Sequence, residues 1–239
     1  MFQKYMGQFS SLFSLKVKTK SIKSYTSSNV LMNLFSKNAP IKIFDVGAHK
    51  GQSARKFKKL FKHSEIYSFE PFPSTFDKLN LLKLDKFKAF NFGFSDRHEF
   101  REFRVNQGSQ TNSMLRLSRN AKAVWGGNEA LSEVDQIKCE FKKIDDFCKA
   151  NYIDCLDFLK IDVQGAEFKV LKGAHELLAA KKIKVIQFEV IIGETYDGQK
   201  PISYYFQLLE NYDYKLKMIC DLVQVDGDLV QADLFFTSD

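Results

Sequence analysis

Residues 41–51 read IKIFDVGAHKG, and this stretch predicts the beginning of an α/β fold. Its first half is a β-rich apolar run, typical of a strand that is buried on both faces of a parallel sheet. Gly47 and Gly51 then bracket a tight turn, where glycine permits positive φ and the close approach of a ligand. Apolar residues at helix spacing follow, namely Ala54, Phe57, Leu60 and Phe61. A strand, a glycine turn and a helix in this order build the nucleotide-binding corner of a doubly wound sheet.

Glu70 makes this corner more specific. It ends a second strand-like run, residues 66–69, and it lies 19 residues after Gly51. An acidic residue at that distance can hold a ribose through its hydroxyl groups. The turn departs from the GxGxxG pattern of dinucleotide sites, because alanine, histidine and lysine separate its two glycines. The combination predicts a nucleoside ligand without a pyrophosphate, such as S-adenosylmethionine (SAM); the alternative is a structural turn beside a solvated carboxylate.

The positive charge of the chain is concentrated at its beginning. The 239 residues include 36 Lys and Arg and 29 Asp and Glu, a net charge of +7. Residues 1–44 hold seven Lys and no acidic residue, which leaves 29 of each sign in the remainder. A neutral body argues against a nucleic-acid groove. We expect residues 1–38 to form a basic helical arm that covers the ligand site or contacts an acidic surface, a membrane or another copy of the chain; a partly ordered tail is the alternative.

Strand and helix patterns alternate over residues 39–239, which predicts one domain with a mostly parallel sheet. The expected strands are 66–69, 87–94, 100–105, 137–141, 156–162 and 183–192, and the expected helices are 75–84, 145–150, 166–178 and 202–209. Residues 214–219 and 234–237 look like a closing antiparallel pair. Residues 106–135 are expected to be a substrate-side insertion, because long irregular segments in compact domains are usually functional or disordered.

Ligands of an open α/β sheet lie outside the carboxyl ends of its strands. The expected strands place there Asp45, Gly47 and His49, then Glu70, then Phe94, Ser95 and Asp96, then Lys160, Asp162, Gln164 and Glu167, and finally Glu189. Several carboxylates therefore converge on one edge. They complement the sulfonium and amino cations of SAM.

Asp162 is the best candidate for a catalytic base, because a carboxylate at this strand end can accept a proton from a substrate hydroxyl. The alternative is that it caps the next helix through backbone amides. Glu189 lies within an apolar strand and needs a partner if it is buried, and Lys160 is the expected one. Glu167 is explained equally well as an acidic residue at a helix start, where the dipole favours it.

Several blocks of the chain together resemble the FkbM family of SAM-dependent methyltransferases. They are FDVGAHKG, FEPFPSTFDKL, GFSD, TNSML, FLKIDVQGAEFKVLKGAHELL and FEV, in this order over roughly residues 41–192. The resemblance implies a class I methyltransferase (Rossmann-like) fold, in which a doubly wound, mostly parallel seven-stranded sheet has an antiparallel last strand. It also implies O-methylation of a hydroxyl on a sugar, a glycolipid or a secondary metabolite.

The same resemblance implies roles for individual residues. Asp45, Gly47, His49 and Gly51 would line the methionine end of SAM, Glu70 and Pro71 would hold the ribose, Phe94 and Ser95 would flank the adenine, and Asp162, Glu167 and Glu189 would be the catalytic residues near the acceptor, with Asp162 also touching the cofactor. One position departs from the family pattern. Gln164 stands where the family usually has Glu.

Two other functions remain open from the sequence. A nucleotide-dependent oxidoreductase could use a similar sheet, although GxGxxG is missing, and a non-catalytic SAM-binding module has Gln164 as its support. Protein or nucleic-acid methylation is disfavoured, because the body is neutral and an Asn/Asp-Pro-Pro-aromatic motif is missing. The four His and four Cys lack metal-ligand spacing, so we expect no metal site among them and free thiols in a cytoplasmic protein. A divalent metal held by the carboxylates is an open alternative that no spacing demands. The expected acceptor is a small molecule or a glycan.

Overall fold

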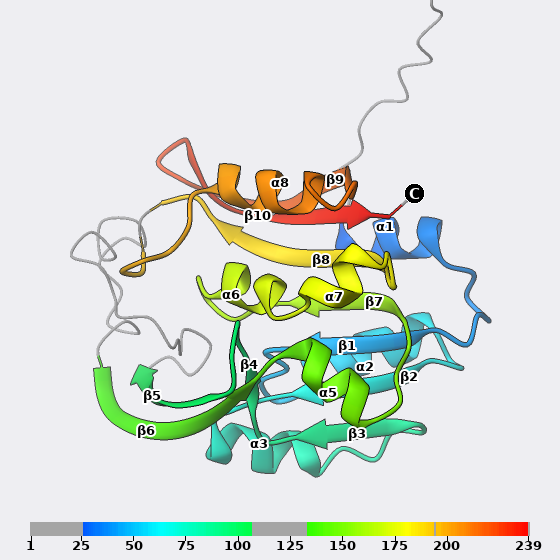
Figure 1. Cartoon of the computed structure of the whole chain (residues 1–239), viewed down its shortest axis with the longest axis horizontal. Coiled ribbons are helices and arrows are strands. Elements are labelled where there is room, and N and C mark those ends of the chain that lie inside the picture. Colours follow the sequence, from blue (N-terminus) through cyan, green and yellow to red (C-terminus); the bar gives the residue numbers. More distant parts are fainter. Residues whose placement is uncertain (1–25, 107–132, 194, 239) are drawn as a thin grey trace, which may run out of the picture.

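The computed structural model describes residues 26–106, 133–193 and 195–238. Its centre is a seven-stranded sheet in the order β3-β2-β1-β7-β8-β10-β9 (Figure 1). The strands are β1 (Lys42–Val46), β2 (Glu65–Phe69), β3 (Phe87–Phe90), β7 (Leu156–Ile161), β8 (Ile183–Ile191), β9 (Lys215–Val225) and β10 (Asp228–Thr237). The first five of the order are parallel, and β10 is antiparallel to both β8 and β9. This confirms the expected class I methyltransferase fold.

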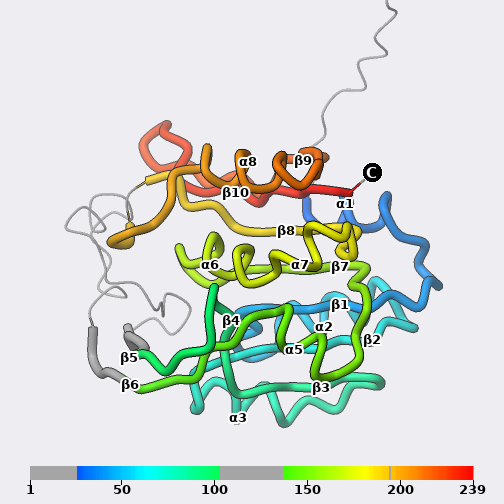
Figure 2. The backbone as a smooth tube through the Cα atoms, viewed as in Figure 1, coloured from blue at the N-terminus to red at the C-terminus, as the bar shows by residue number. Residues whose placement is uncertain are grey.

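Helices cover both faces of the sheet (Figures 1 and 2). One face carries α1 (Ser27–Leu34), α2 (Gln52–Leu60) and α3 (Pro73–Asn80), and the other carries α5 (Ile144–Ala150), α6 (Glu167–Lys172), α7 (His175–Ala179) and α8 (Ile202–Glu210). Alternate strand residues point to opposite cores, so that Ile43, Phe158 and Val185 pack on the α1 and α2 side and Phe44, Leu159 and Ile186 on the other. Burial on both faces explains the near-continuous apolar runs of these strands.

A second sheet, in the order β4-β6-β5, lies on the side of the molecule where the parallel strands end (Figure 1). Its strands are β4 (Gly93–Phe94), β5 (Glu99–Asn106) and β6 (Glu133–Lys142). The single strand expected over 87–94 is therefore wrong, because β3 ends at Phe90 and the last two residues pair with β6. Between them, the side-chain amide of Asn91 donates to the carbonyl oxygen of Glu70 at 3.0 Å. Most of the expected insertion, residues 107–132, lies outside the described residues.

The helix expected over 166–178 is two helices, α6 and α7, which separate at Gly173. A Cβ atom at Gly173 would lie 2.1 Å from the carbonyl oxygen of Ser95, so glycine permits the close approach of these segments. The carboxylate of Asp145 accepts two amide hydrogens of α7, one of them from Glu176 at 2.9 Å. This contact caps α7 from a neighbouring helix. The helical spacing of apolar residues in the sequence continues through Gly173, so it does not predict that the helix is interrupted there.

The described part of the expected N-terminal arm contains a helix, α1. Val30 and Leu31 are buried in the core that includes Phe158. The hydroxyl of Ser27 donates to Asp233 at 2.9 Å and also contacts Asp221. This section therefore packs on a face of the sheet and contacts acidic side chains there, while residues 1–25 lie outside the described residues. Within the described residues, no helix has the length and apolar character that crossing a membrane requires.

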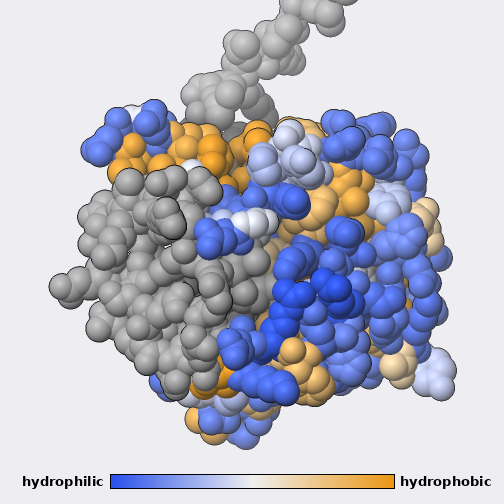
Figure 3. Space-filling view, turned by 60° about the vertical axis from the view of Figure 1, so that its left-hand side comes forward, coloured by the Kyte–Doolittle hydropathy of each residue, from blue (hydrophilic) through white to orange (hydrophobic). Residues whose placement is uncertain are grey.

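Exposed apolar side chains gather along one edge of the molecule. They lie over α8 and the β9–β10 edge, the upper rim of Figure 3, and include Ile192, Tyr204, Leu216, Ile219, Leu222 and Val223. β9 is the last strand of the main sheet on this side. The apolar surface is thus at the opposite end of the sheet from β3.

Candidate active site

The turn after β1 lies against the turn after β7. Gly47 has a φ of +81°, and a Cβ atom there would lie 1.8 Å from the carbonyl oxygen of Asp162. The amides of Gly47 and Ala48 donate to the carbonyl oxygen of Phe69 at 3.0 and 3.1 Å. Glycine is required here both by the positive φ and by the lack of space for a side chain. The turn joins the carboxyl ends of β1, β2 and β7.

Glu70 lies beside this turn, at the end of β2. One of its carboxylate oxygens accepts the amide hydrogen of His49 at 2.9 Å, and the other accepts that of Phe72 at 3.0 Å. The residue is only 7% exposed. Burial raises the pKa of Glu70 to about 7, although the two amides oppose that shift. The structure thus brings together the glycine turn and the carboxylate that the sequence assigned to the ribose.

Asp45 is enclosed beneath the same turn. It is 0% exposed, and its carboxylate accepts a hydrogen bond from Ser68 at 3.3 Å and lies 3.5 Å from the ammonium of Lys160. Burial raises the pKa of Asp45, and Lys160 opposes the rise. Asp45 is buried below the sheet edge and is linked to Asp162 by the ammonium of Lys160. Its expected contact with a cofactor remains a prediction.

Lys160 links Asp45 to Asp162. Its ammonium lies 3.1 Å from a carboxylate oxygen of Asp162, and Asp45 is its register neighbour on β1. Burial alone would lower the pKa of Lys160, but Asp162 and Asp45 together raise it. The expected ion pair between Lys160 and Glu189 is wrong. Glu189 lies two residues beyond Gln187, the register partner of Lys160, so Asp45 and Asp162 are the nearer carboxylates.

Asp162 is held by side chains from both directions. Besides Lys160, the side-chain amide of Gln164 donates to it at 3.1 Å. The side chain of Asp162 remains 34% exposed, so part of the carboxylate is open at the strand end. The capping alternative does not hold, because the amide of Gly165 donates to Glu167 instead. The structure therefore presents a fixed and partly accessible carboxylate beside Gly47.

Gln164 also bridges to Glu189. Its amide donates to one carboxylate oxygen of Glu189 at 2.9 Å, and Gln231 donates to the other at 2.6 Å. Burial, together with the nearby charges of Asp162 and Glu167, raises the pKa of Glu189 well above its ordinary value. Glu189 thus accepts hydrogen bonds from two side-chain amides, and its raised pKa disfavours the charged form. Both features suit a residue that positions Gln164.

Glu167 holds the turn after β7 from inside. It is 1% exposed, and one oxygen accepts the amide hydrogens of Val163 at 3.0 Å and Gly165 at 3.1 Å. Burial raises its pKa to about 7. These contacts make Glu167 a residue that positions the turn, while its expected role beside an acceptor remains a prediction.

The residues expected around the adenine lie at the start of the second sheet. Phe94 is 1% exposed, and its ring packs 4.5 Å from that of Phe69 between centroids, so it belongs to the aromatic core. Ser95 is fully buried and its hydroxyl lies 3.3 Å from carboxylate oxygens of Asp96 and Glu99. Pro71 follows Glu70 directly and is half-buried. The contacts expected between these residues and a cofactor remain predictions.

Three polar residues make contacts at the site that the sequence did not predict. Lys160 was expected to pair with Glu189, and Gln164 was noted as a departure from the family pattern. Tyr196 was not placed at the edge, and its hydroxyl donates to the side-chain oxygen of Gln164 at 3.3 Å. The ring of Tyr196 packs against Gly165, where a Cβ atom would lie 2.7 Å from it. Local sequence pattern does not indicate that Lys160 is buried beside Asp45, because this contact depends on the register of β7 against β1. No pattern in the sequence connects Tyr196 or Gln231 to this turn.

Comparison with known proteins agrees with this arrangement. A family model described as the methyltransferase FkbM domain matches residues 45–216. The chain is 28% identical over 191 residues to the 2-O-methyltransferase NoeI of Sinorhizobium fredii, covering 77% of this chain and 76% of that protein. It is also 28% identical over 156 residues to the methyltransferase sdnD of Sordaria araneosa, covering 56% of this chain and 60% of sdnD.

Solved structures with similar backbones have little sequence identity to this chain. A SAM-dependent methyltransferase from Aquifex aeolicus is 11% identical, with a TM-score of 0.44 and coverage of 89% of this chain and 90% of that one. The magnesium protoporphyrin IX methyltransferase of Synechocystis is 7% identical, with a TM-score of 0.49 and coverage of 89% and 80%.

Proposed function

Because the chain belongs to the FkbM family of SAM-dependent methyltransferases, we propose that it is an O-methyltransferase that acts on a hydroxyl of a sugar, a glycolipid or a secondary metabolite. Family membership removes the oxidoreductase alternative. The relative NoeI is a 2-O-methyltransferase, which supports oxygen as the acceptor atom. We also propose that the enzyme works in the cytoplasm, which agrees with the four free cysteines.

The residues at the sheet edge fit SAM, which supplies an electrophilic methyl group when it is bound. Gly47 leaves the backbone of its turn bare, and the Glu70 carboxylate lies beside that turn, where a ribose hydroxyl could donate to it. The carboxylates of Glu70 and Asp162 flank the turn and complement a cationic ligand. These residues, with His49 and Gly51, are the proposed cofactor contacts.

The observation that carries the proposal is the position of Asp162. Its carboxylate is partly exposed beside Gly47, and Lys160 and Gln164 hold it in one orientation. In the proposed reaction the acceptor oxygen bonds to the methyl carbon, the carbon–sulfur bond breaks, and the hydroxyl proton passes to Asp162. The chain contributes by orienting the acceptor and by receiving this proton.

The test is Asp162→Asn, which keeps the shape and the contact with Gln164 but removes the basic oxygen pair. We expect kcat to fall by about a hundredfold or more, while SAM affinity measured by calorimetry falls by a much smaller factor, about tenfold at most, because Glu70 still holds the ribose. Turnover can be followed with methyl-labelled SAM and a panel of sugars, glycolipids and phenolic metabolites. Unchanged turnover would remove Asp162 from the mechanism, and labelling of none of these hydroxyl acceptors would contradict the acceptor class.

A further inference from the structure

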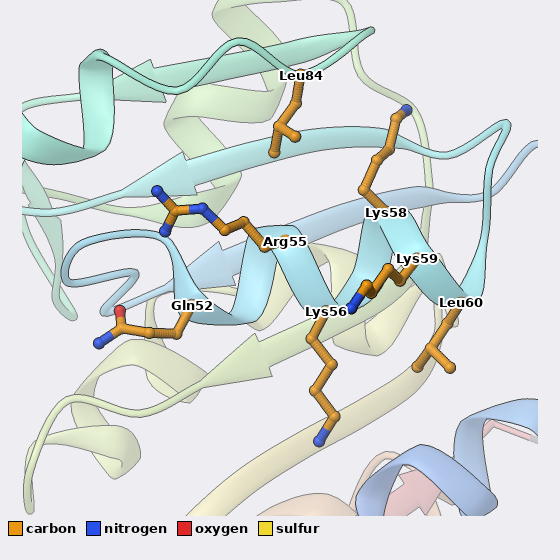
Figure 4. A pocket seen from close by; sticks show the side chains of 7 residues that line it. All are labelled: Gln52, Arg55, Lys56, Lys58, Lys59, Leu60 and Leu84. Carbon is orange, nitrogen blue, oxygen red and sulfur yellow. The ribbon is translucent and has the colours of Figure 1, made fainter.

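Four cations line one hollow on the outer side of α2. They are Arg55, Lys56, Lys58 and Lys59, and they share the hollow with Gln52, Leu60 and Leu84 (Figure 4). Arg55 and Lys58 extend toward Leu84, whereas Lys56 extends to the other side with Leu60. Three of the four cations are exposed, and α2 contains no acidic residue. The lining thus combines four cations with two aliphatic side chains.

The carboxylate of Asp85 lies among these cations and its charge acts on that of Lys58, but the two form no ion pair. Within the described ranges, none of the four is ion-paired with a carboxylate; Arg55 and Lys58 donate only to backbone carbonyl oxygens, at 3.1 and 2.7 Å. On the opposite face of the sheet, by contrast, cations such as Lys149 form ion pairs; its ammonium lies 2.7 Å from the carboxylate of Glu176. The positive potential of the α2 side is therefore available to a partner.

Further cations and exposed apolar side chains surround the hollow. Lys62, Lys83 and Lys86 are exposed beside α2. Met32 on α1 is 51% exposed and Leu81 after α3 is 73% exposed. We call these residues and the hollow the α2 face. Cations interleaved with exposed aliphatic side chains suit a lipid surface, which takes both charge and apolar contact.

A nucleic acid fits the α2 face less well. Sequence-tolerant binding of single strands depends on aromatic side chains on which bases stack. The aromatic residues of α2 and its end, Phe57 and Phe61, are 3% and 0% exposed. The face offers aliphatic carbon instead.

The N-terminal segment of the sequence is also basic. Residues 1–25 contain five Lys and no acidic residue, and they join the described chain at Thr26, the N-cap of α1. α1 is the neighbour of α2, since the rings of Phe35 and Phe61 lie 5.9 Å apart. The junction at Thr26 is at the start of α1, where Ser27 contacts Asp221 and Asp233, so the α2 face is defined without residues 1–25.

We propose that the α2 face docks this protein on the surface of a bilayer that contains anionic phospholipid. Each cation held near such a surface strengthens binding by roughly fivefold, and salt weakens it. The α2 face lies on a flank of the sheet, and it meets the candidate active site at Gln52, whose side-chain amide lies 3.2 Å from the ring of His49. This inference is independent of the acceptor and of Asp162.

The test is sedimentation of the full chain with vesicles of phosphatidylcholine alone or with one third phosphatidylglycerol. We expect binding only to the anionic vesicles, with loss at high salt. The double variant Lys56→Glu/Lys59→Glu should bind at least about tenfold more weakly. The matched control Lys182→Glu/Lys217→Glu changes the same charge at exposed positions away from α2 and should retain most of the binding.

Three results would overturn the proposal. One is the absence of wild-type binding to anionic vesicles. Another is an equal loss in both double variants, which would mean that total charge and not the α2 face is responsible. The third is tighter binding to single-stranded RNA than to vesicles, which would make the face a nucleic-acid surface. Circular dichroism and SAM affinity establish that both variants are folded, since neither alters a residue of the candidate active site.

Discussion

At the turn after β1 and at the turn after β7, a buried glutamate accepts backbone amide hydrogens. Glu70 accepts the backbone amide of His49 at the first turn and that of Phe72 after β2, and Glu167 accepts two backbone amides at the second turn. Both glutamates are buried, and burial raises the pKa of each to about 7. The turns differ in what they present, because the second adds Asp162, a partly exposed carboxylate held by Lys160 and Gln164.

This difference separates the shape of the site from its chemistry. A turn held by backbone amides depends on glycine and on one buried acceptor, so it is a rigid surface for a ligand. A turn that adds side-chain bridges can fix a reactive group as well. We therefore expect changes at the first turn to act on cofactor affinity, and changes at the second to act on turnover or on local stability.

The largest effect is expected from Gly47→Ala. The new Cβ atom would overlap the carbonyl oxygen of Asp162 and would also require a positive φ. The two turns would have to separate, which we expect to cost about 3 kcal/mol or more of the free energy of unfolding and to abolish measurable SAM binding. Urea denaturation and calorimetry measure the two effects.

The matched control for this variant is Gly198→Ala. Gly198 has a φ of +80°, close to that of Gly47, but a Cβ atom there would meet nothing within 4 Å. It should cost only the backbone strain, about 1 kcal/mol, and leave SAM affinity intact. Similar costs at both positions would show that the contact between the two turns is unimportant.

The next largest effects are expected from Glu70→Ala and Glu167→Ala, which should differ in SAM affinity but not in stability. Each substitution leaves two amides without their acceptor, so each should lower the free energy of unfolding by about 2–4 kcal/mol. Only Glu70→Ala should also weaken SAM binding directly, by about tenfold or more. If calorimetry shows the same loss of affinity in both variants, Glu70 has no ribose role of its own.

These two glutamates illustrate how far the sequence predicts the site. The β-turn-α pattern and its spacing were enough to place Glu70 beside Gly47, because strand order and chain direction follow from local pattern. Glu167 was correctly put at a helix start, but its acceptance of the Val163 amide was not predicted. Contacts such as Lys160 with Asp45 depend on register across strands, which local pattern leaves open.

Long-range contacts also explain the wrong element boundaries. The apolar period of residues 166–178 is continuous, yet the chain breaks at Gly173 because Ser95 approaches it closely. Phe94, which the family resemblance places beside the adenine, packs its ring in the aromatic core around Phe69, a contact that the local pattern does not show. In both cases the deciding neighbour is distant in the chain.

The two turns should also make stability depend on pH. Between pH about 4.5 and about 7, the unfolded chain has released the protons of Glu70 and Glu167, while the folded chain retains them. The folded state then binds more protons, so the free energy of unfolding falls as pH rises through this window. Glu189, whose pKa is also raised, acts in the same direction.

Urea midpoints measured across this window check the expectation. The midpoint should be lower at pH about 8 than at pH about 5, apart from other groups. Glu167→Gln has no titrating carboxyl at this position and should show a shallower fall. A midpoint that rises over the same window in the wild-type chain would contradict the protonated state of these two glutamates.

The smallest effect should come from Gln164→Glu, which restores the residue usual in the family. Gln164 donates to the carboxylates of Asp162 and Glu189 at any pH, whereas a glutamate could donate only while it holds a proton. At neutral pH the variant would place a third carboxyl group beside Asp162 and Glu189. We expect this to lower the free energy of unfolding by about 1 kcal/mol, and by less as the pH falls. Gln164→Met, which loses the donors without adding charge, should cost a similar amount at every pH. If the Glu variant instead matches the wild type in urea midpoint and kcat at pH about 8, the bridge from Gln164 is dispensable, and Lys160 alone fixes Asp162.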